Sequence, residues 1–244
     1  MKTAIIIPSR LGSTRLPRKP LRQIDGMTLV ERVYRQCKKA AGIDSVLIAT
    51  DSDEIAKHVH SFGAEAIMTP EDCVNGTERV AYAARHLAEG YDVIMNVQGD
   101  EPLIDPAVIE LVAAAFQDEK VKIATPISPL RDRADIENPN IVKVVTDSHD
   151  DILYFSRSPI PHDRDASHQV KYWKHIGLYA FRRSILEEIR HLAETELENI
   201  EKLEQLRWLY HGYKIRAVRV DYNSVEVNTE EDVQKVEAIL KHNS

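Results

Sequence analysis

The sequence has little cysteine, no long apolar run and no excess of basic residues. Its two cysteines, Cys37 and Cys73, are too few for a disulfide framework, and neither has the spacing of a zinc site. The apolar run within MKTAIIIPSR is too short for a signal-peptide core or a membrane span, and no longer run occurs later. We therefore expect a cytoplasmic protein without a membrane partner.

The charge balance is acidic, with a formal net charge of −7 and a pI of about 5.8. General binders of nucleic acid or of membrane surfaces are usually basic, so we expect no nucleic-acid partner. The length of 244 residues and the 43% hydrophobic content suit one α/β domain with a substantial core.

The first half of the chain alternates between two hydrophobic periods. Apolar runs typical of buried strands cover 3–8, 45–50, 64–68 and 91–97. Helical periods lie between and after them, at 28–41, 51–60, 76–88 and 106–117. The alternation predicts a mainly parallel sheet covered by helices on both faces, which is a three-layer α/β/α Rossmann-like fold.

The second half is less regular. It predicts strands at 122–126, 142–146, 152–155, 173–181 and 214–220, and helices at 184–192, 198–211 and 230–241. No linker is visible, so we treat 1–244 as a single domain. A small lobe is expected as an insertion at about 131–173.

The loop after the first strand is strongly basic. Between Ser9 and Ile24 the sequence has no acidic residue, and its basic residues are Arg10, Arg15, Arg18, Lys19 and Arg22. Gly12 adds backbone freedom at the carboxyl edge of a parallel sheet, where phosphates commonly bind. The loop matches neither a Walker A motif nor a G-x-G-x-x-G fingerprint. A phosphate cradle is the favoured interpretation, and a solvated basic turn is the alternative.

The strand at 91–97 ends in an acidic turn, Gln98-Gly99-Asp100-Glu101. A carboxylate directly after a buried strand is well placed to hold Mg²⁺ against a phosphate, because Mg²⁺ favours one or two carboxylates plus phosphate oxygens and water. The alternative is a helix-capping or turn acid. Asp105-Pro106 already begins the next helix, so Asp100 is not needed as a cap.

Several separated motifs carry a resemblance to a known family, in that family's order along the chain. They are IIIPSRLGSTRLPRKPL, ATDSDEI, NGTERVA, NVQGDEP, YFSRSPIP, KHIGLY and LEQLR. With these motifs the chain resembles the 3-deoxy-manno-octulosonate cytidylyltransferases over almost its whole length. The resemblance implies a nucleotidyltransferase fold, CTP and an acidic sugar as substrates, Mg²⁺ as cofactor, and a homodimer. It also implies a role in sugar binding or dimerisation for the lobe at about 131–173.

The resemblance also implies roles for individual residues. CTP binding falls to Arg10, Leu11, Gly12, Ser13, Arg15, Lys19, Asp51, Gly76, Thr77 and Arg79. Sugar binding falls to Gln98, Arg157, His175, Tyr179, Glu204 and Gln205. The catalytic residues are Arg15, Lys19 and Asp100, and the metal ligands are Asp100 and Asn228. From the residues alone, a helix cap is the favoured interpretation for Asp51 and the alternative for Gly76–Arg79, and core packing is favoured for His175 with Tyr179.

The chain departs from the family pattern in two segments. The family usually has glycine where this chain has Arg18. Its last strand usually ends in V-D-T-P-E-D, whereas this chain has Val227-Asn228-Thr229-Glu230-Glu231-Asp232. An asparagine offers a carbonyl oxygen but no charge, so Mg²⁺ should bind more weakly unless phosphates or a neighbour such as Glu226 compensate.

The expected function is transfer of CMP from CTP to 3-deoxy-manno-octulosonate, which activates this sugar for lipopolysaccharide synthesis. One alternative is a related acid, such as the 8-amino derivative or a nonulosonate. The other alternative is a CTP-binding relative with weakened catalysis, for which Asn228 is the only support.

Overall fold

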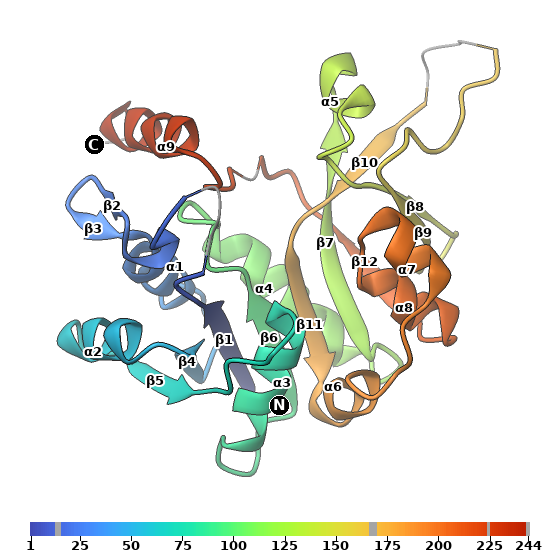
Figure 1. The fold of residues 1–244 in the computed structure, drawn as a ribbon. Helices are drawn as coiled ribbons and strands as arrows, with labels where there is room; N and C mark the ends of the chain where they lie inside the picture. Colours follow the sequence, from blue (N-terminus) through green and yellow to red (C-terminus); the bar gives the residue numbers. More distant parts are fainter. Residues whose placement is uncertain (13–15, 166–169, 224, 243–244) are drawn as a thin grey trace. The chain divides into compact units, whose positions relative to one another are not determined.

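The computed structural model describes residues 1–12, 16–165, 170–223 and 225–242. It divides into two compact units, Met1–Ala113 with Ser224–Ser244, and Ala114–Asn223 (Figure 1). The lobe expected at 131–173 falls inside the second unit. The single-domain organisation stays a prediction. No helix in the described ranges combines the length and apolar character needed to cross a membrane.

A parallel sheet with strand order β5-β4-β1-β6 forms the centre of the first unit. Its strands are β1 (Thr3–Ser9), β4 (Ser45–Thr50), β5 (Glu65–Met68) and β6 (Val93–Val97). The side chains from Ala4 to Ile7 are completely buried. Successive strand residues point to opposite faces, so both faces of β1 are covered, as the uninterrupted apolar run predicts.

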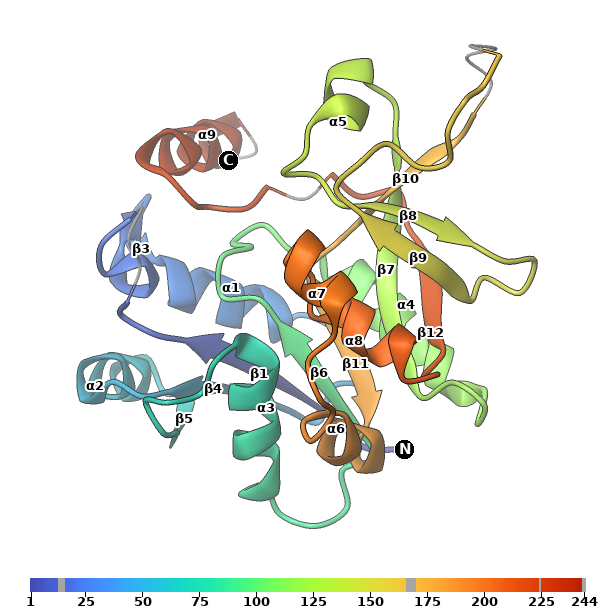
Figure 2. The same ribbon diagram turned by 45° about the vertical axis from the view of Figure 1, so that its right-hand side comes forward.

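Helices follow these strands and begin at polar caps. They are α1 (Leu29–Cys37), α2 (Asp53–Ser61), α3 (Gly76–Arg85) and α4 (Pro106–Ala114). The side chains of Thr28, Ser52 and Asn75 each accept a hydrogen bond from the backbone N–H three residues later. Ser52 therefore caps α2, which leaves the Asp51 carboxylate for another partner. Figure 2 shows α3 in front of the sheet, where it contacts β1, β4 and β6.

The sequence reasoning missed the short elements that follow the basic loop. A 3₁₀ turn, η1, covers Lys19–Leu21, and a small hairpin joins β2 (Gln23–Ile24) to β3 (Met27–Thr28). Arg18, just before η1, has φ of 57°, in the left-handed region where glycine is strained least. This conformation explains why a glycine suits the same position in the family that the chain resembles.

The end of the chain returns to the first unit. The last helix, α9 (Glu230–His242), contributes Val233 and Val236 to a buried cluster with Leu16, Ile24, Leu29 and Val227. The backbone N–H of Val227 donates to the Asp100 carbonyl oxygen at 2.8 Å. Packing and this bond together hold Asn228 beside the turn that follows β6.

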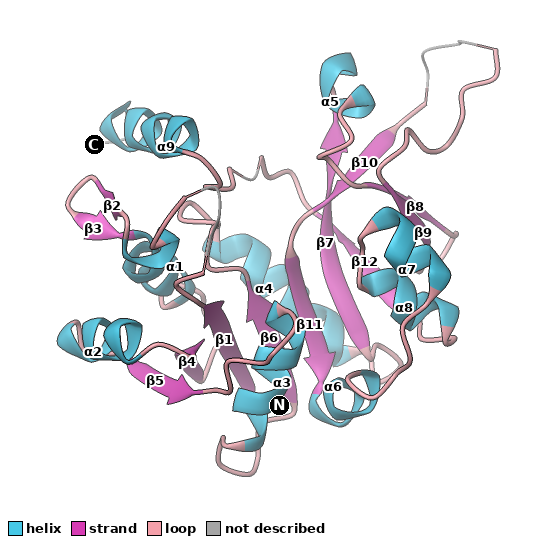
Figure 3. Ribbon diagram, in the orientation of Figure 1, coloured by secondary structure: helices cyan, strands magenta, loops and turns pink. Residues whose placement is uncertain are grey.

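The second unit is a mixed sheet around a long strand, β7 (Ile123–Leu130). Two strands pair with β7 in antiparallel orientation, β10 (Tyr172–His175) and β11 (Leu178–Arg182). A third strand, β12 (Ile215–Arg219), pairs with β7 in parallel orientation. Beyond β10 lie β8 (Lys143–Thr146) and β9 (Ile152–Ser156). Figure 3 shows the helices α5 (Arg133–Glu137), α6 (Arg183–Ile189), α7 (Glu196–Glu201) and α8 (Gln205–Tyr210). A 3₁₀ turn, η2, covers Ala115–Gln117.

Two expected elements of this unit are each split in the structure, and α5 was not predicted. The strand expected at 173–181 is interrupted at Ile176 and Gly177, between β10 and β11. The helix expected at 198–211 breaks at Lys202, whose φ of 54° cannot continue a right-handed helix. The expected helix is therefore present as two short helices, α7 and α8, and Tyr210 at the end of α8 is 67% exposed.

Candidate functional site

A pocket lies where the topology of the first unit reverses. The chain runs from β1 to β4 and β5 on one side, then returns to place β6 on the other side of β1. In open parallel sheets, ligands bind in the crevice that this reversal leaves at the carboxyl ends of the strands. Pro8 and Ser9 end β1, and Gln98 follows β6, and all three line a pocket of about 410 Å³.

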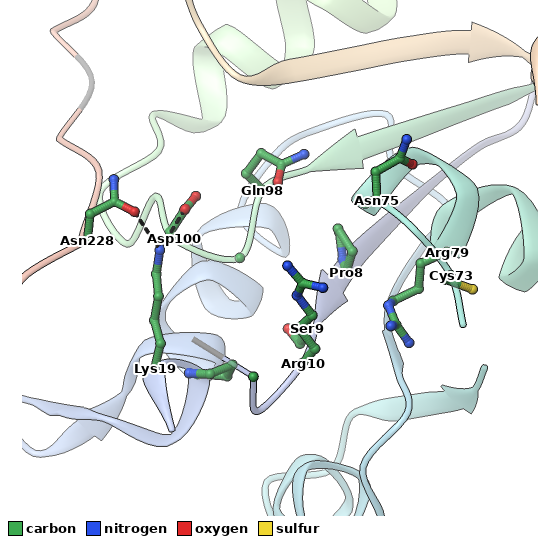
Figure 4. Close-up of a pocket in the computed structure, with 14 residues that line it drawn as sticks. Pro8, Ser9, Arg10, Lys19, Cys73, Asn75, Arg79, Gln98, Asp100 and Asn228 are labelled. Atoms are coloured by element: carbon green, nitrogen blue, oxygen red, sulfur yellow. Dashed lines mark hydrogen bonds and ion pairs between the residues drawn. The ribbon is translucent and has the colours of Figure 1, made fainter. Parts of the chain in front are cut away.

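The pocket combines the basic loop, the start of α3 and the acidic turn (Figure 4). Its lining residues are Pro8, Ser9, Arg10, Gly12, Lys19, Pro20, Cys73, Asn75, Gly76, Arg79, Gln98, Gly99, Asp100 and Asn228. Cationic side chains and the N-terminus of a helix thus face one space, which is an arrangement suited to phosphate groups.

Gly99 permits the strand ends to approach closely. A Cβ atom at this position would lie 2.9 Å from the Pro8 carbonyl oxygen and 3.2 Å from Ser9 Oγ. Any larger residue would therefore push the turn after β6 away from β1. The Q-G-D sequence is explained by this contact, because the glycine brings Gln98 and Asp100 to the pocket wall.

Asn96 orients two of the predicted site residues, and sequence reasoning missed it. It is completely buried on β6, where its Nδ2 donates to Thr77 Oγ1 at 3.3 Å. Its Oδ1 accepts from Gln98 Nε2 at 3.2 Å. The available signal was a polar residue in the middle of an apolar strand, because a buried amide must find partners.

Lys19 links the two predicted metal ligands. Its Nζ donates to Asp100 Oδ2 at 2.8 Å and to Asn228 Oδ1 at 3.0 Å (Figure 4). The Lys19 and Asp100 side chains are only 16% and 25% exposed, so water screens their pairing incompletely. Two residues 128 positions apart in the chain therefore direct oxygen atoms at a single positive charge.

The oxygens of this set fit a divalent ion. A carboxylate and an amide oxygen already converge on a cation, and both are the hard donors that Mg²⁺ takes. The described residues contain no group of three or more His, Cys, Asp or Glu side chains that could hold a metal by themselves. Phosphate oxygens and water would have to complete the coordination, which is the usual arrangement for Mg²⁺ at nucleotides.

Arg79 is buried beside the pocket and is held by Asp51. Its Nη2 donates to Asp51 Oδ2 at 2.6 Å, and its Nη1 also bonds to Thr69 Oγ1. The Arg79 side chain is 3% exposed and that of Asp51 is 16% exposed. Asp51 therefore acts on the pocket through Arg79.

Aromatic rings surround His175 in the second unit. Its ring lies 5.0 Å from that of Tyr179 and 5.3 Å from that of Phe155, measured between centroids. Burial lowers the pKa of His175 to about 3. Thr125 Oγ1 donates to the Leu178 carbonyl oxygen at 2.6 Å, so it must accept from His175 Nε2 at 3.0 Å. This pattern assigns a neutral imidazole with its proton on Nε2.

The Tyr179 hydroxyl is buried without a hydrogen-bond partner among the described residues. Burial, and next the nearby Glu204 carboxylate, raise the pKa of Tyr179, so its hydroxyl keeps its proton. A buried donor without a partner is uncommon, because its desolvation is not compensated. This hydroxyl is available to a polar ligand.

Arg157 is held in place by its own unit. Its Nε donates to the Glu201 carbonyl oxygen at 2.7 Å, and its Nη1 donates to the Pro139 carbonyl oxygen at 3.0 Å. The Glu201 carboxylate accepts from Ser156 Oγ at 2.7 Å and from the Arg157 backbone N–H at 2.9 Å. Completely buried Lys143 also donates to the Arg157 carbonyl oxygen. Sequence reasoning missed Glu201 and Lys143.

Known proteins are similar to this chain over nearly its whole length. The model of the cytidylyltransferase family matches residues 4–215. A 3-deoxy-manno-octulosonate cytidylyltransferase of Myxococcus xanthus is 45% identical, with 98% of this chain and 97% of that protein covered. One from Chloroherpeton thalassium is 47% identical, with 98% of each chain covered.

A solved structure is similar as well. It is a CMP:2-keto-3-deoxy-manno-octonic acid synthetase complexed with CTP, 37% identical, with complete coverage of both chains and a TM-score of 0.95. This chain belongs to the 3-deoxy-manno-octulosonate cytidylyltransferase family. The α/β nucleotidyltransferase fold predicted from the motifs is thereby confirmed.

The predicted residues of this cytidylyltransferase are distributed as follows. The pocket brings together Arg10, Gly12, Lys19, Gly76, Arg79, Gln98, Asp100 and Asn228. Leu11, Asp51 and Thr77 do not line it, although Asp51 bonds to Arg79 in the lining and Thr77 bonds to buried Asn96. Ser13 and Arg15 lie outside the described residues. The second unit contains Arg157, His175, Tyr179, Glu204 and Gln205. The roles of all these residues in binding and catalysis stay predictions.

Proposed function

We propose that the protein transfers CMP from CTP to 3-deoxy-manno-octulosonate and releases pyrophosphate. The observation that carries this proposal is the similarity over nearly the full length to proteins named for this reaction. The pocket at the reversal of the first sheet supports it, because cationic side chains and a helix N-terminus face the same space.

The reaction is an in-line displacement at the α-phosphorus of CTP. The anomeric C2 hydroxyl oxygen of the sugar forms the new bond to phosphorus, and the bond to the bridging oxygen of the β-phosphate breaks. The hydroxyl proton leaves to solvent or to pyrophosphate. Such enzymes act mainly by positioning the reactants and neutralising charge.

Residues of the pocket neutralise charge in this proposal. Lys19 and Arg10 would bind phosphate oxygens, and Arg15 is proposed for the same task. The N-terminus of α3 at Gly76 directs backbone N–H groups toward the same space. Asp100 and Asn228 would hold Mg²⁺, which supplies further positive charge next to the phosphates when it is bound.

Sugar recognition is proposed for Gln98 and for the set Arg157, His175, Tyr179, Glu204 and Gln205. An arginine can pair with a sugar carboxylate, and the Tyr179 hydroxyl lacks a protein partner among the described residues. We further propose a role in activating the sugar of lipopolysaccharide, a homodimeric assembly and a cytoplasmic location. Size-exclusion chromatography with light scattering and cell fractionation test the last two.

The test of the function is pyrophosphate release by the purified protein with CTP, Mg²⁺ and 3-deoxy-manno-octulosonate. UTP and ATP replace CTP as controls, and the 8-amino sugar and a nonulosonate replace the acceptor. We expect release only with CTP and the octulosonate. Release with another acid sugar alone would correct the acceptor, whereas CTP binding without release from any acceptor would contradict catalysis.

A further inference from the structure

The side-chain amide of Asn228 has two oriented partners. Its Oδ1 accepts from Lys19 Nζ at 3.0 Å, and its Nδ2 donates to Glu226 Oε2 at 3.2 Å. An ammonium group only donates and a carboxylate only accepts, so a single amide orientation satisfies both bonds. The amide therefore connects the Glu226 carboxylate to the ammonium group of Lys19.

We propose that Glu226 supplies the second negative charge of the cation site through the amide of Asn228. This inference rests on the proposed function, because it concerns the Mg²⁺ that accompanies CTP. Glu226 is a positioning residue, since it does not contact the ion. By accepting from Nδ2 it fixes the amide and increases the negative charge on Oδ1.

Asparagine at position 228 is what allows this arrangement. An aspartate there would direct an oxygen at the Glu226 carboxylate, and two like charges at hydrogen-bond distance repel each other. The amide offers a donor instead, so the carboxylate can remain close. The family usually carries this negative charge at position 228. In this chain the charge lies on Glu226, which contacts the amide of Asn228 instead of the ion.

Two other carboxylates near Asn228 serve local structure. Asp232 Oδ2 accepts from the backbone N–H groups of Asn228 and Thr229 at 3.1 and 3.0 Å, which caps the start of α9. Glu230 forms an ion pair with Arg22. Both carboxylates therefore have structural partners at the start of α9.

The experiment measures CTP binding by calorimetry over a range of Mg²⁺ concentrations, without sugar, so that no turnover occurs. The quantity compared is the Mg²⁺ concentration that gives half of the maximal increase in CTP affinity. The variants are Glu226→Gln and Asn228→Asp, singly and combined. Glu226→Gln keeps an acceptor for Nδ2 and removes only the charge. Glu231→Gln, on the exposed first turn of α9, is the control for loss of one charge.

We expect Glu226→Gln to raise this concentration by about 3- to 10-fold, which is at or below the lower end of effects seen for groups that support metal ligands, because Glu226 is exposed. Asn228→Asp should lower it about tenfold, since the ion then meets a second carboxylate directly. In the Asn228→Asp background, Glu226→Gln should change it by less than about twofold, because the amide link is gone.

An equal effect of Glu226→Gln in both backgrounds, or an equal effect of Glu231→Gln, would overturn the inference and leave the proposed function intact. CTP binding that ignores Mg²⁺ would also overturn it. Absence of CTP binding by the unmodified protein would overturn the proposed function, and this inference with it. Normal binding with no pyrophosphate release would affect only the proposed function.

Discussion

The buried ion pair between Arg79 and Asp51 should contribute more to stability than an exposed ion pair of the first unit. Asp51→Ala leaves a guanidinium that is 3% exposed without its carboxylate. Removal of one partner of a buried pair costs about 3 kcal/mol, because the remaining charge stays desolvated. For a chain of this size, that loss lowers the melting temperature by roughly 6–12 °C. Thermal unfolding by circular dichroism measures it.

A matched control is available on the surface of the same unit. Arg18 and Glu54 also form an ion pair, but their side chains are 62% and 47% exposed. Glu54→Ala should therefore cost about 1 kcal/mol or less. In an Arg79→Met background, Asp51→Ala should cost much less than in the native chain, because no unpaired cation remains. Equal losses for Asp51→Ala and Glu54→Ala would refute the reasoning.

Three further predictions concern other residues. The unfolded chain binds a proton on His175 near pH 6.5 and the folded chain near 3. The free energy of unfolding therefore has its full contribution from the neutral ring above about pH 6.5. As the pH falls from 6.5 toward 3 this contribution is lost, by at most about 1.4 kcal/mol per pH unit. His175→Gln should flatten this dependence in urea unfolding, and an unchanged slope would contradict the assignment. Burial raises the pKa of both Cys37 and Cys73, so neither thiol should react rapidly with a disulfide reagent in the native protein, whereas both should react in denaturant. Glu201→Gln should raise the KM for the sugar more than it lowers kcat if Arg157 binds the sugar carboxylate, and equal changes in both would argue against that role.

Much of the first unit is predictable from the sequence for a physical reason. A strand that is buried on both faces is apolar without interruption. The apolar runs at Ile5–Ile7 and at 45–50 therefore predict where these two strands lie. Parallel strands end at the same edge of the sheet, so the residues after β1 and β6 are expected to meet. Arg10, Gln98 and Asp100 line a common pocket on this account.

The supporting contacts could not be predicted, because they join residues far apart in the chain. Glu201 accepts a hydrogen bond from the backbone of Arg157, 44 positions away. The sequence around Glu201 itself predicts only an ordinary amphipathic helix. The helix break at Lys202 is also invisible, since a lysine rather than a glycine adopts the left-handed conformation there. In such places packing of the whole unit overrides the local preference.

The contacts that hold Asn228 in position differ from those that its side chain makes. The backbone around it is fixed by the Val227 N–H bond to Asp100 and by the burial of Val227 and Val233. None of these contacts uses the amide group. An exchange of asparagine for aspartate therefore leaves the anchors of the segment in place, and its main effect falls on the charge presented to Lys19. The asparagine therefore changes the charge of a segment whose anchors do not depend on its amide, and that amide donates to the neighbouring carboxylate of Glu226.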